Sequence, residues 1–358
     1  MYQESGGKRR EIESHYTLGH AGKGGTANVA IRLASYERDV PVVIDPGVQF
    51  TVPISTIYGG SGLDQFRDGD VDPSGNIFVT GQSSSADYPT TVGAFQTTYG
   101  GNVDAVVVKF DSTGNPLAST YVGGSSFDSA NAIWVTSTSA FVVGTTYSGN
   151  FPVTDGSKLN LGKSTSNSDA FLFKISADLS SLTASTLIGG GASDQGNALT
   201  TDSLGDAIVA GTTFSSDLLK TPGVVQPTIN LGKSTAASDI YISVLDGTSL
   251  ARKATTYLGG SGNESGNGVA INPIDNTVFV GGSTSSTDLP GTSGELQSTL
   301  TGNQAGAIIH VPLDLSKILG ATYFGGTATN APQPSTAYLT INGVAVNTSG
   351  KGLASGGR

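Results

Sequence analysis

The chain has 358 residues with 18 Lys and Arg against 28 Asp and Glu, giving a formal net charge of −10 and a pI near 4.6. This acidic balance argues against nucleic-acid binding, which needs a basic surface to displace phosphate counterions. Cysteine is absent, which excludes disulfides and cysteine-ligated metals, and no apolar run reaches the roughly 18 residues of a membrane-spanning helix. With 51 Gly and abundant Ser and Thr, the composition favours short strands joined by tight turns, and hence an all-β protein.

Residues 1–55 precede the first copy of a repeat and contain strand-like runs, so we expect a leader segment that is distinct from residues 56–358. The leader opens with Met1-Tyr2-Gln3-Glu4, which lacks the charged-then-apolar order of a secretory signal peptide. Its last part, PVVIDPGVQFTVPISTIYGG (41–60), ends in the closing phrase of the repeat.

From residue 56 onward a five-residue phrase occurs five times, as TIYGG, TYVGG, TLIGG, TYLGG and TYFGG. The second Gly of each phrase is separated from the next by 64, 66, 70 and 66 residues. A regular period of this length indicates a repeat architecture.

Each period predicts four strands. The stretch GNGVAINPIDNTVFVGG (266–282) is typical of a hairpin, and a long loop rich in Ser, Thr and Pro follows it. A second hairpin then closes the period, as in residues 104–124, where DSTGN supplies the turn. Four antiparallel strands make one blade of a β-propeller, and the expected blades are residues 61–124, 125–190, 191–260 and 261–326.

A fifth blade is expected from both ends of the chain. Residues 327–358 match only the first hairpin of a repeat, in GVAVNTSGKGLASGG (343–357), while the leader ends like a second hairpin. We therefore predict a five-bladed ring in which N-terminal and C-terminal strands complete the last blade. An incomplete larger ring is the alternative.

The motifs VDPSGNIFVTG (71–81), SADYPTTVGAFQ (85–96), SDAFLFKI (168–175) and the GG phrases recur together over about 300 residues. In this the chain resembles the bacterial β-propeller repeats of the SBBP type, a family named for a presumed seven-bladed ring. The segment GKRREIESHYTL followed by PVVIDPGVQF is similar to the end of a domain that often precedes these repeats. The resemblance implies an extracellular or cell-surface protein whose signal peptide lies upstream of this chain, and it assigns no activity.

An acidic residue follows each GG phrase within a few positions. In a propeller these loops emerge on the same face as the long loops between the middle strands, so this long-loop face is the expected binding surface. One hypothesis is a ring of carboxylates at the channel mouth that forms a metal or sugar site or an acid/base pair; the other is a structural cap of backbone N–H groups at every blade junction. The residues are Asp64, Asp128, Asp194 and Glu264, and a related set of expected caps is Asp104, Asp169 and Asp239.

Blade one departs most from the repeat. Where the other blades have NAI, NAL or NGV, it has Arg67-Asp68-Gly69-Asp70-Val71-Asp72. Asp68 and Asp70 alternate along a strand and share one face near Asp64, so they join the catalytic candidates, and with Asp72 they form a candidate Ca²⁺ site. The alternative gives Asp72 to the turn and pairs the other carboxylates with Arg67. Arg67 is also a candidate ligand-binding residue.

Three further residues are candidates for ligand binding. Trp134, the only tryptophan, occupies the column of Asp70 and is suited either to sugar stacking or to packing between blades. Lys163 and Lys233 lie in duplicated NLGKST loops, which lack the glycine spacing of a phosphate loop and so predict no nucleotide site. His310 interrupts an apolar strand without a GxSxG motif, which predicts a hydrogen-bonded structural histidine.

Three functions remain open. The first is an extracellular module that binds carbohydrate or a surface protein through its long-loop face. The second is a polysaccharide-acting glycoside hydrolase, which would need two carboxyl groups about 5 to 9.5 Å apart in an accessible pocket. The third is a structural spacer of a large surface protein, without a concave pocket. No cofactor is predicted with the exception of Ca²⁺.

Overall fold

The computed structural model describes residues 2–5, 8–11, 14–18, 29–33, 42–43, 56–156, 167–218, 221–230, 237–325, 340–346 and 352–357. The chain divides into two compact units, Met1–Ser55 and Thr56–Arg358. Among the described residues every regular element is a strand, and no helix has the length and hydropathy of a membrane span.

The first unit contains five short strands in two sheets. They are β1 (Tyr2–Ser5), β2 (Lys8–Glu11), β3 (Ser14–Leu18), β4 (Val29–Leu33) and β5 (Val42–Val43). One sheet has the order β2-β1-β5 and the other pairs β3 with β4, with antiparallel neighbours throughout.

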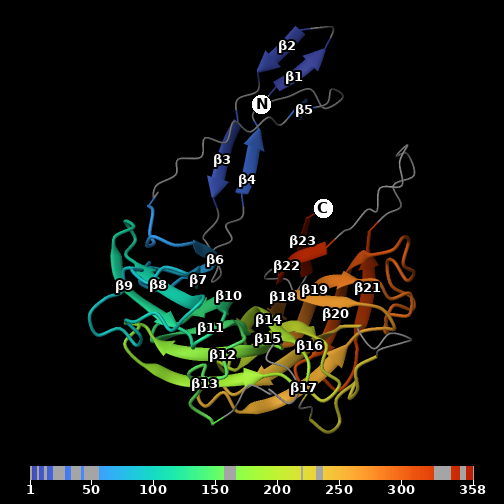
Figure 1. Ribbon diagram of the computed structural model, residues 1–358. Coiled ribbons are helices and arrows are strands. Elements are labelled where there is room, and N and C mark those ends of the chain that lie inside the picture. The colour runs from blue at the N-terminus through green and yellow to red at the C-terminus, as the bar shows by residue number, and fades with distance from the viewer. Residues whose placement is uncertain are drawn as a thin grey trace. The chain divides into compact units, whose positions relative to one another are not determined.

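The second unit contains four sheets, each of four antiparallel strands in chain order, which confirms the predicted β-propeller blades (Figure 1). Blade one comprises β6 (Asp64–Val71), β7 (Ile77–Ser83), β8 (Asp104–Phe110) and β9 (Pro116–Val122). Blade two comprises β10 (Asp128–Val135), β11 (Ser139–Thr146), β12 (Asp169–Ser176) and β13 (Leu182–Ile188). Blade three comprises β14 (Asp194–Thr201), β15 (Ala207–Thr213), β16 (Asp239–Leu245) and β17 (Arg252–Leu258). Blade four comprises β18 (Glu264–Asn272), β19 (Thr277–Thr284), β20 (Ala305–Pro312) and β21 (Gly320–Phe324).

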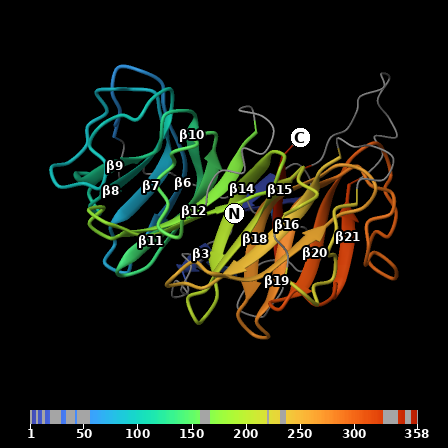
Figure 2. The same cartoon turned by 60° about the horizontal axis from the view of Figure 1, so that its bottom comes forward.

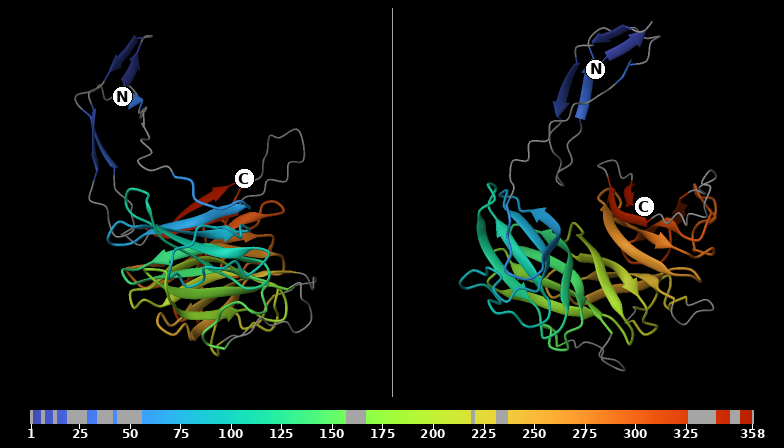
Figure 3. Two further views of the ribbon diagram at one scale, coloured as in Figure 1. Left: turned by 60° about the vertical axis from the view of Figure 1, so that its left-hand side comes forward. Right: turned by 45° about the horizontal axis from the view of Figure 1, so that its top comes forward.

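A fifth, two-stranded sheet follows, formed by β22 (Thr340–Val346) and β23 (Gly352–Gly357). Ile341 and Val344 of β22 pack against Gly281 of β19, so the hairpin continues the series beside blade four. The blades and the hairpin follow one another around an arc (Figures 2 and 3). Completion of this blade by N-terminal strands stays a prediction. In the predicted stretch, β4 and β5 pair with β3 and β1 of the first unit, and residues 44–55 fall outside the described residues.

The core lies between neighbouring blades, because strand side chains alternate between the two faces of each sheet. In β12, Phe171 and Phe173 pack with Val107 of blade one, while the intervening Leu172 packs with Val209 of blade three. Val280 continues the series in a cluster shared by blades three and four. Each fully buried side chain of this kind contributes about 1.5–3 kcal/mol, so the blades stabilise one another by their contact faces.

The GG phrase marks the closest approach between an outer strand and the next blade. A Cβ added to the second Gly would lie 2.6 Å from the Cβ of a serine in the following blade, as for Gly124 against Ser148 and Gly260 against Ser286. Only glycine fits at this spacing, which explains why the phrase recurs with each blade.

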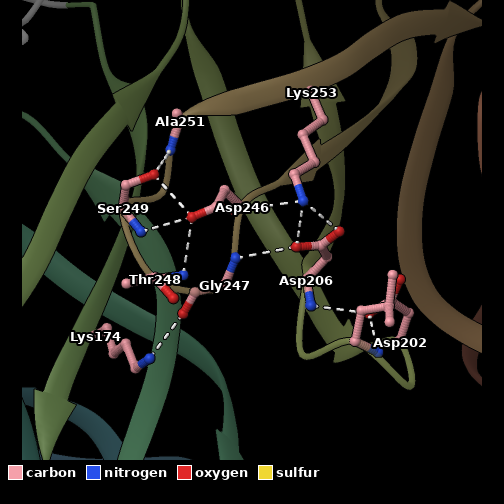
Figure 4. A network of polar contacts seen from close by, with 10 residues as sticks. Lys174, Asp202, Asp206, Asp246, Gly247, Thr248, Ser249, Ala251 and Lys253 are labelled. Atoms are coloured by element: carbon pink, nitrogen blue, oxygen red, sulfur yellow. Dashed lines mark hydrogen bonds and ion pairs between the residues drawn. The ribbon is translucent and has the colours of Figure 1, made fainter.

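On the face opposite the long loops, lysines connect blade one to blade two and blade two to blade three. Lys109 Nζ donates to the carbonyl oxygen of Ala177 at 3.1 Å, and Lys174 Nζ donates to that of Gly247 at 2.7 Å. In blade three, Lys253 contacts both oxygens of Asp206 at 2.7 Å, and Gly247 N–H donates to Asp206 (Figure 4). These bonds fix the short turns to one another across two blade boundaries.

Candidate functional site

A β-bulge interrupts the innermost strand of each blade and of the final hairpin. The pairing register shifts by one residue at the same place in β6, β10, β14, β18 and β22. A bulge adds one residue to the strand and redirects its side chain out of the alternation. The bulged residues all line one cavity, and they are Arg67, Asn131, Asn197, Asn267 and Asn342.

The partner strand explains how the bulge is accommodated. A Cβ on Gly144 of β11 would collide with the carbonyl oxygen of Ser129 beside the bulge in β10, and Gly81, Gly211 and Gly282 occupy the equivalent position in the other blades. The glycine of the VTG, VVG, VAG and VGG sequences is therefore the residue that permits the bulge.

The cavity has a volume of ≈ 710 Å³, within the range of small-molecule sites. Its lining is polar and rich in carboxamides, and none of the described residues that line it is acidic. Besides the five bulged residues it contains Gln65, Phe66, Phe127, Ser129, Thr145, Tyr147 and Gln195. Several of these stand at the start of an inner strand or the end of a second strand, which places the cavity toward the long-loop face.

The asparagines are held by hydrogen bonds from blade to blade. Asn131 Nδ2 donates to the carbonyl oxygen of Gly196 at 2.8 Å, and Asn197 Nδ2 donates to that of Gly266 at 2.8 Å. Asn267 Nδ2 donates to the carbonyl oxygen of Ile341 at 3.4 Å. Each amide is thereby fixed in orientation. The oxygens of Asn131 and Asn267 each accept one bond within the protein, from Arg67 and Ser265, and keep a second lone pair that can accept from a ligand.

Arg67 breaks this series. Its guanidinium donates to Asn131 Oδ1 at 3.0 Å and to Gln82 Oε1 at 3.1 Å, so both of its partners are neutral amides.

Two further features of the lining are a pair of aromatic rings and a buried hydroxyl. The rings of Phe127 and Tyr147 meet edge to face with centroids 6.0 Å apart. The hydroxyl of Ser129 is buried, with the residue 3% exposed, and finds no hydrogen-bond partner among the described residues. This oxygen has almost no exposed surface, so it lies behind the wall of the cavity.

The carboxylates that follow the GG phrases lie at the blade junctions and outside the lining of the cavity. Asp128 and Asp194 are fully buried and accept hydrogen bonds from the backbone N–H of Gly124 and Gly190, each at 2.7 Å. Glu264 makes the same bond to Gly260 at 2.9 Å.

Serine hydroxyls complete these junctions: Ser148 donates to Asp128 at 2.8 Å and Ser215 donates to Asp194 at 2.7 Å. Asp64 has the equivalent partners in Gly60 and Ser85. The geometry therefore matches the second hypothesis, a structural cap at each junction, and differs from a ring of carboxylates at the channel mouth.

Burial raises the pKa of three of these carboxyl groups. The pKa of Asp194 rises to about 6, and those of Asp128 and Glu264 also rise. The caps before the third strands behave alike, since burial raises the pKa of Asp104 and of Asp239 to about 7.

The acidic residues of blade one bind the backbone of blade two. Asp68 Oδ2 accepts a hydrogen bond from Ile133 N–H at 2.9 Å, and Asp70 Oδ2 accepts one from Val135 N–H at 2.7 Å. Asp72 accepts bonds from residues of its own turn and lies 3.7 Å from Lys109. In the ranges that the structure describes, no group of three or more Asp, Glu or His side chains is placed to hold a metal ion.

The other candidates lie away from the cavity or outside the described residues. Trp134 is 36% exposed on β10 and is not part of the lining. Lys163 and Lys233 fall in the stretches 157–166 and 231–236, which the structure does not describe. His310 stacks on Phe279 with centroids 4.1 Å apart and contacts the hydroxyl of Thr277 at 2.6 Å, as expected of a structural histidine.

Sequence reasoning named Arg67 but missed the asparagines beside it. Their signal was present, since NAI, NAL and NGV repeat at the same position of each inner strand. A residue that recurs in every blade was interpreted as part of the scaffold, while the bulge that turns it toward the cavity has no local signature in the inner strand itself.

No family model and no curated protein matches the chain. Among solved structures it is similar to two single-residue variants of the Synechocystis apocarotenoid oxygenase, both at 11% identity over 73% of this chain and 50% of theirs, with TM-scores of 0.37 and 0.36. A chimera built on that oxygenase matches at 11% identity over 81% of this chain and 56% of the other, with a TM-score of 0.38. The chain thus spans about half the length of these proteins.

Proposed function

We propose that this protein is a non-catalytic, extracellular binding module that takes a carbohydrate at the cavity between its blades. The observation that carries the proposal is the cavity lining, in which polar side chains converge from all five inner strands and three of them are asparagines whose amides are bonded to the next sheet.

The chemistry of the lining favours a sugar over an apolar ligand. Carboxamides and hydroxyls donate and accept hydrogen bonds and so match the paired donor and acceptor character of sugar hydroxyls. Phe127 and Tyr147 add apolar ring surface of the kind that packs on a sugar face. Because the asparagine side chains are already ordered, little conformational entropy is lost on binding.

A glycan array with the purified protein tests the proposal. We expect binding to a subset of glycans, and about tenfold weaker binding for Gln195→Ala and for Tyr147→Ala, a loss of about 1.4 kcal/mol each. The matched control is Thr228→Ala, which alters a second cavity of ≈ 350 Å³ near blades three and four. Absence of any glycan binding, or equal losses in the control, would contradict the proposal.

The glycoside hydrolase and the structural spacer remain alternative predictions. A chromogenic-glycoside screen distinguishes the first, since turnover that is lost in Asp194→Asn or Glu264→Gln variants that still fold would establish an enzyme. A structural spacer predicts no binding on the glycan array and no turnover in the glycoside screen. If a surface protein is the partner instead, no glycan on the array binds, and the cavity variants leave the binding of that protein partner unchanged.

The calcium site also stays a prediction. It rests on Asp68, Asp70 and Asp72, and it predicts that millimolar Ca²⁺ raises the melting temperature of the wild-type protein but not that of Asp68→Asn/Asp70→Asn. An unchanged melting temperature in the wild type would reject the site.

A further inference from the structure

We infer that the ligand of the cavity is an acidic glycan whose carboxylate pairs with Arg67; the inference rests on the proposed function and specifies its substrate class. The starting observation is the symmetry of the lining. Four of the five bulged positions carry asparagine, and the fifth carries the only cationic side chain among the described lining residues.

The scaffold does not account for the charge of Arg67. Each of the three bulged asparagines before β22 uses its amide to hold the next sheet, and a neutral side chain suffices for that bond. Arg67 instead donates to the side chains of Asn131 and Gln82, two uncharged acceptors. Within the described part of the chain it has no ion pair.

The neighbouring carboxylates are engaged elsewhere. Asp68 accepts bonds from Gly69 and Ile133 with its two oxygens, and Asp70 accepts bonds from Val71 and Val135. Neither residue lines the cavity. Both carboxylates therefore accept bonds from the backbone of blade two. The charge of the Arg67 guanidinium is left available to a ligand.

The geometry of the guanidinium selects a carboxylate. Arginine has five N–H donors in a rigid fork, of which Asn131 and Gln82 occupy two, and the remaining donors suit a planar, bidentate acceptor. The bond that Arg67 donates to Asn131, whose own amide donates to Gly196, fixes the orientation of the fork.

The remaining lining favours a sugar acid over an acidic peptide. Carboxamides make up most of the remaining polar lining, and they match ring hydroxyls beside the carboxylate. The net charge of −10 disfavours dense polyanions such as nucleic acids or heavily sulfated chains. The structure therefore points to glycans with isolated carboxylates, such as uronic or sialic acid residues.

The test is an array that carries uronate-containing, sialylated, sulfated and neutral glycans, followed by calorimetry on the best glycan and on its carboxyl methyl ester. We expect binding confined to carboxylate-bearing glycans and at least about tenfold weaker binding of the methyl ester. Arg67→Gln should lose at least about tenfold for the acid and nothing for the ester, and Lys317→Gln, which removes the same charge far from the cavity, should change neither.

The outcomes separate the inference from the proposed function. Equal binding of neutral glycans, or full retention of the acidic glycan by Arg67→Gln, overturns the inference and leaves the binding module intact. If no glycan on the array binds, both the inference and the proposed function are overturned. Melting temperatures of the variants show whether a loss of binding reflects unfolding, and an Arg67→Lys variant that restores part of the affinity supports direct charge pairing.

Discussion

At the scale of single residues, glycines decide where the inner strands can bulge. In blade two, a Cβ on Gly144 would meet the carbonyl oxygen of Ser129 and lie 2.5 Å from the ring of Phe171, which is fully buried. Neither neighbour can move without disturbing the core between blades, so the sequence tolerates no side chain here.

We therefore expect Gly144→Ala to destabilise the protein by about 1–3 kcal/mol, the range for overpacking a core. Urea denaturation measures the change. The control is Gly191→Ala, whose Cβ would lie 3.2 Å from the carboxylate of Asp217, a flexible side-chain end that can shift. Equal stability of Gly144→Ala and the wild type would show that the bulge adapts.

Buried carboxyl groups make stability depend on pH. The pKa of Asp104 and of Asp239 is about 7 in the folded protein, and that of Asp194 is about 6, whereas an unfolded aspartate titrates near 3.9. Between these values the folded state binds more protons than the unfolded state, so stability falls as pH rises from about 4 to 7 and then levels off.

Melting curves should thus give a higher melting temperature at pH 5 than at pH 8. The double variant Asp104→Asn/Asp239→Asn should lose most of this difference, because its side chains no longer titrate. Groups with a lowered pKa, such as Asp178 at about 2, change the stability only below about pH 4. A wild-type melting temperature that rises toward pH 8 would contradict the assignment.

Residues of the junctions were predictable, and those of the cavity only in part. Asp128 and Asp194 follow glycine pairs at a constant spacing, and their role as caps was one of two hypotheses from that spacing alone. Asp68 and Asp70 are candidates for a Ca²⁺ site because they alternate along one strand. Their hydrogen-bond donors Ile133 and Val135 lie some 65 residues away in the next blade, and no local pattern encodes that pairing.

At the scale of elements, lysines on the third strands join one blade to the next. Lys174 of β12 donates to the carbonyl oxygen of Gly247 and lies 4.9 Å from the ring centroid of Phe141. Lys109 of β8 repeats both contacts with Ala177 and Phe78. The lysine of SDAFLFKI (168–175) and the equivalent lysine of β8 thus connect sheets that share no strand.

Replacement of this lysine should loosen the boundary between blades two and three. We expect Lys174→Met to cost about 1–3 kcal/mol, since the carbonyl of Gly247 loses its donor while the apolar stem is kept. Lys317→Met, at an exposed site, should stay within about 0.5 kcal/mol of the wild type. Similar denaturation midpoints for the two variants would argue against a role for the contact.

The strands themselves were the most predictable elements. Alternating apolar residues and the turns DPSGN and DSTGN placed four strands in each period, and the structure confirms them. The bulges were missed because the residues around them are small or polar. The added residue, such as Asn131, shifts the alternation by one position, so that Ala130 and Ile133 face the same cluster, but too few large apolar residues precede it for this shift to be visible.

At the scale of the whole molecule, each blade depends on its neighbours. Ile341 of the final hairpin is 1% exposed and fills the space left by Gly281 and Gly306 of blade four. The hairpin therefore covers a face that blade four cannot bury by itself.

Ile341→Ala should cost about 2–5 kcal/mol, the range for a cavity left by a buried isoleucine. We expect faster amide hydrogen exchange in β18–β20 than in β10–β12, because repeat proteins lose stability first next to the altered interface. The control is Val92→Ala, at a fully exposed side chain. Uniform acceleration in all blades would instead indicate one cooperative unit.

The bulge has a consequence for how such proteins diversify. Its side chain lies outside the apolar clusters between the sheets, so an exchange at this position removes one or two hydrogen bonds but no part of that core. The positions are Arg67, Asn131, Asn197, Asn267 and Asn342. The blades then act as a constant framework, and only the five bulged side chains vary. Related chains can acquire new ligands by single substitutions at these positions while their fold is conserved.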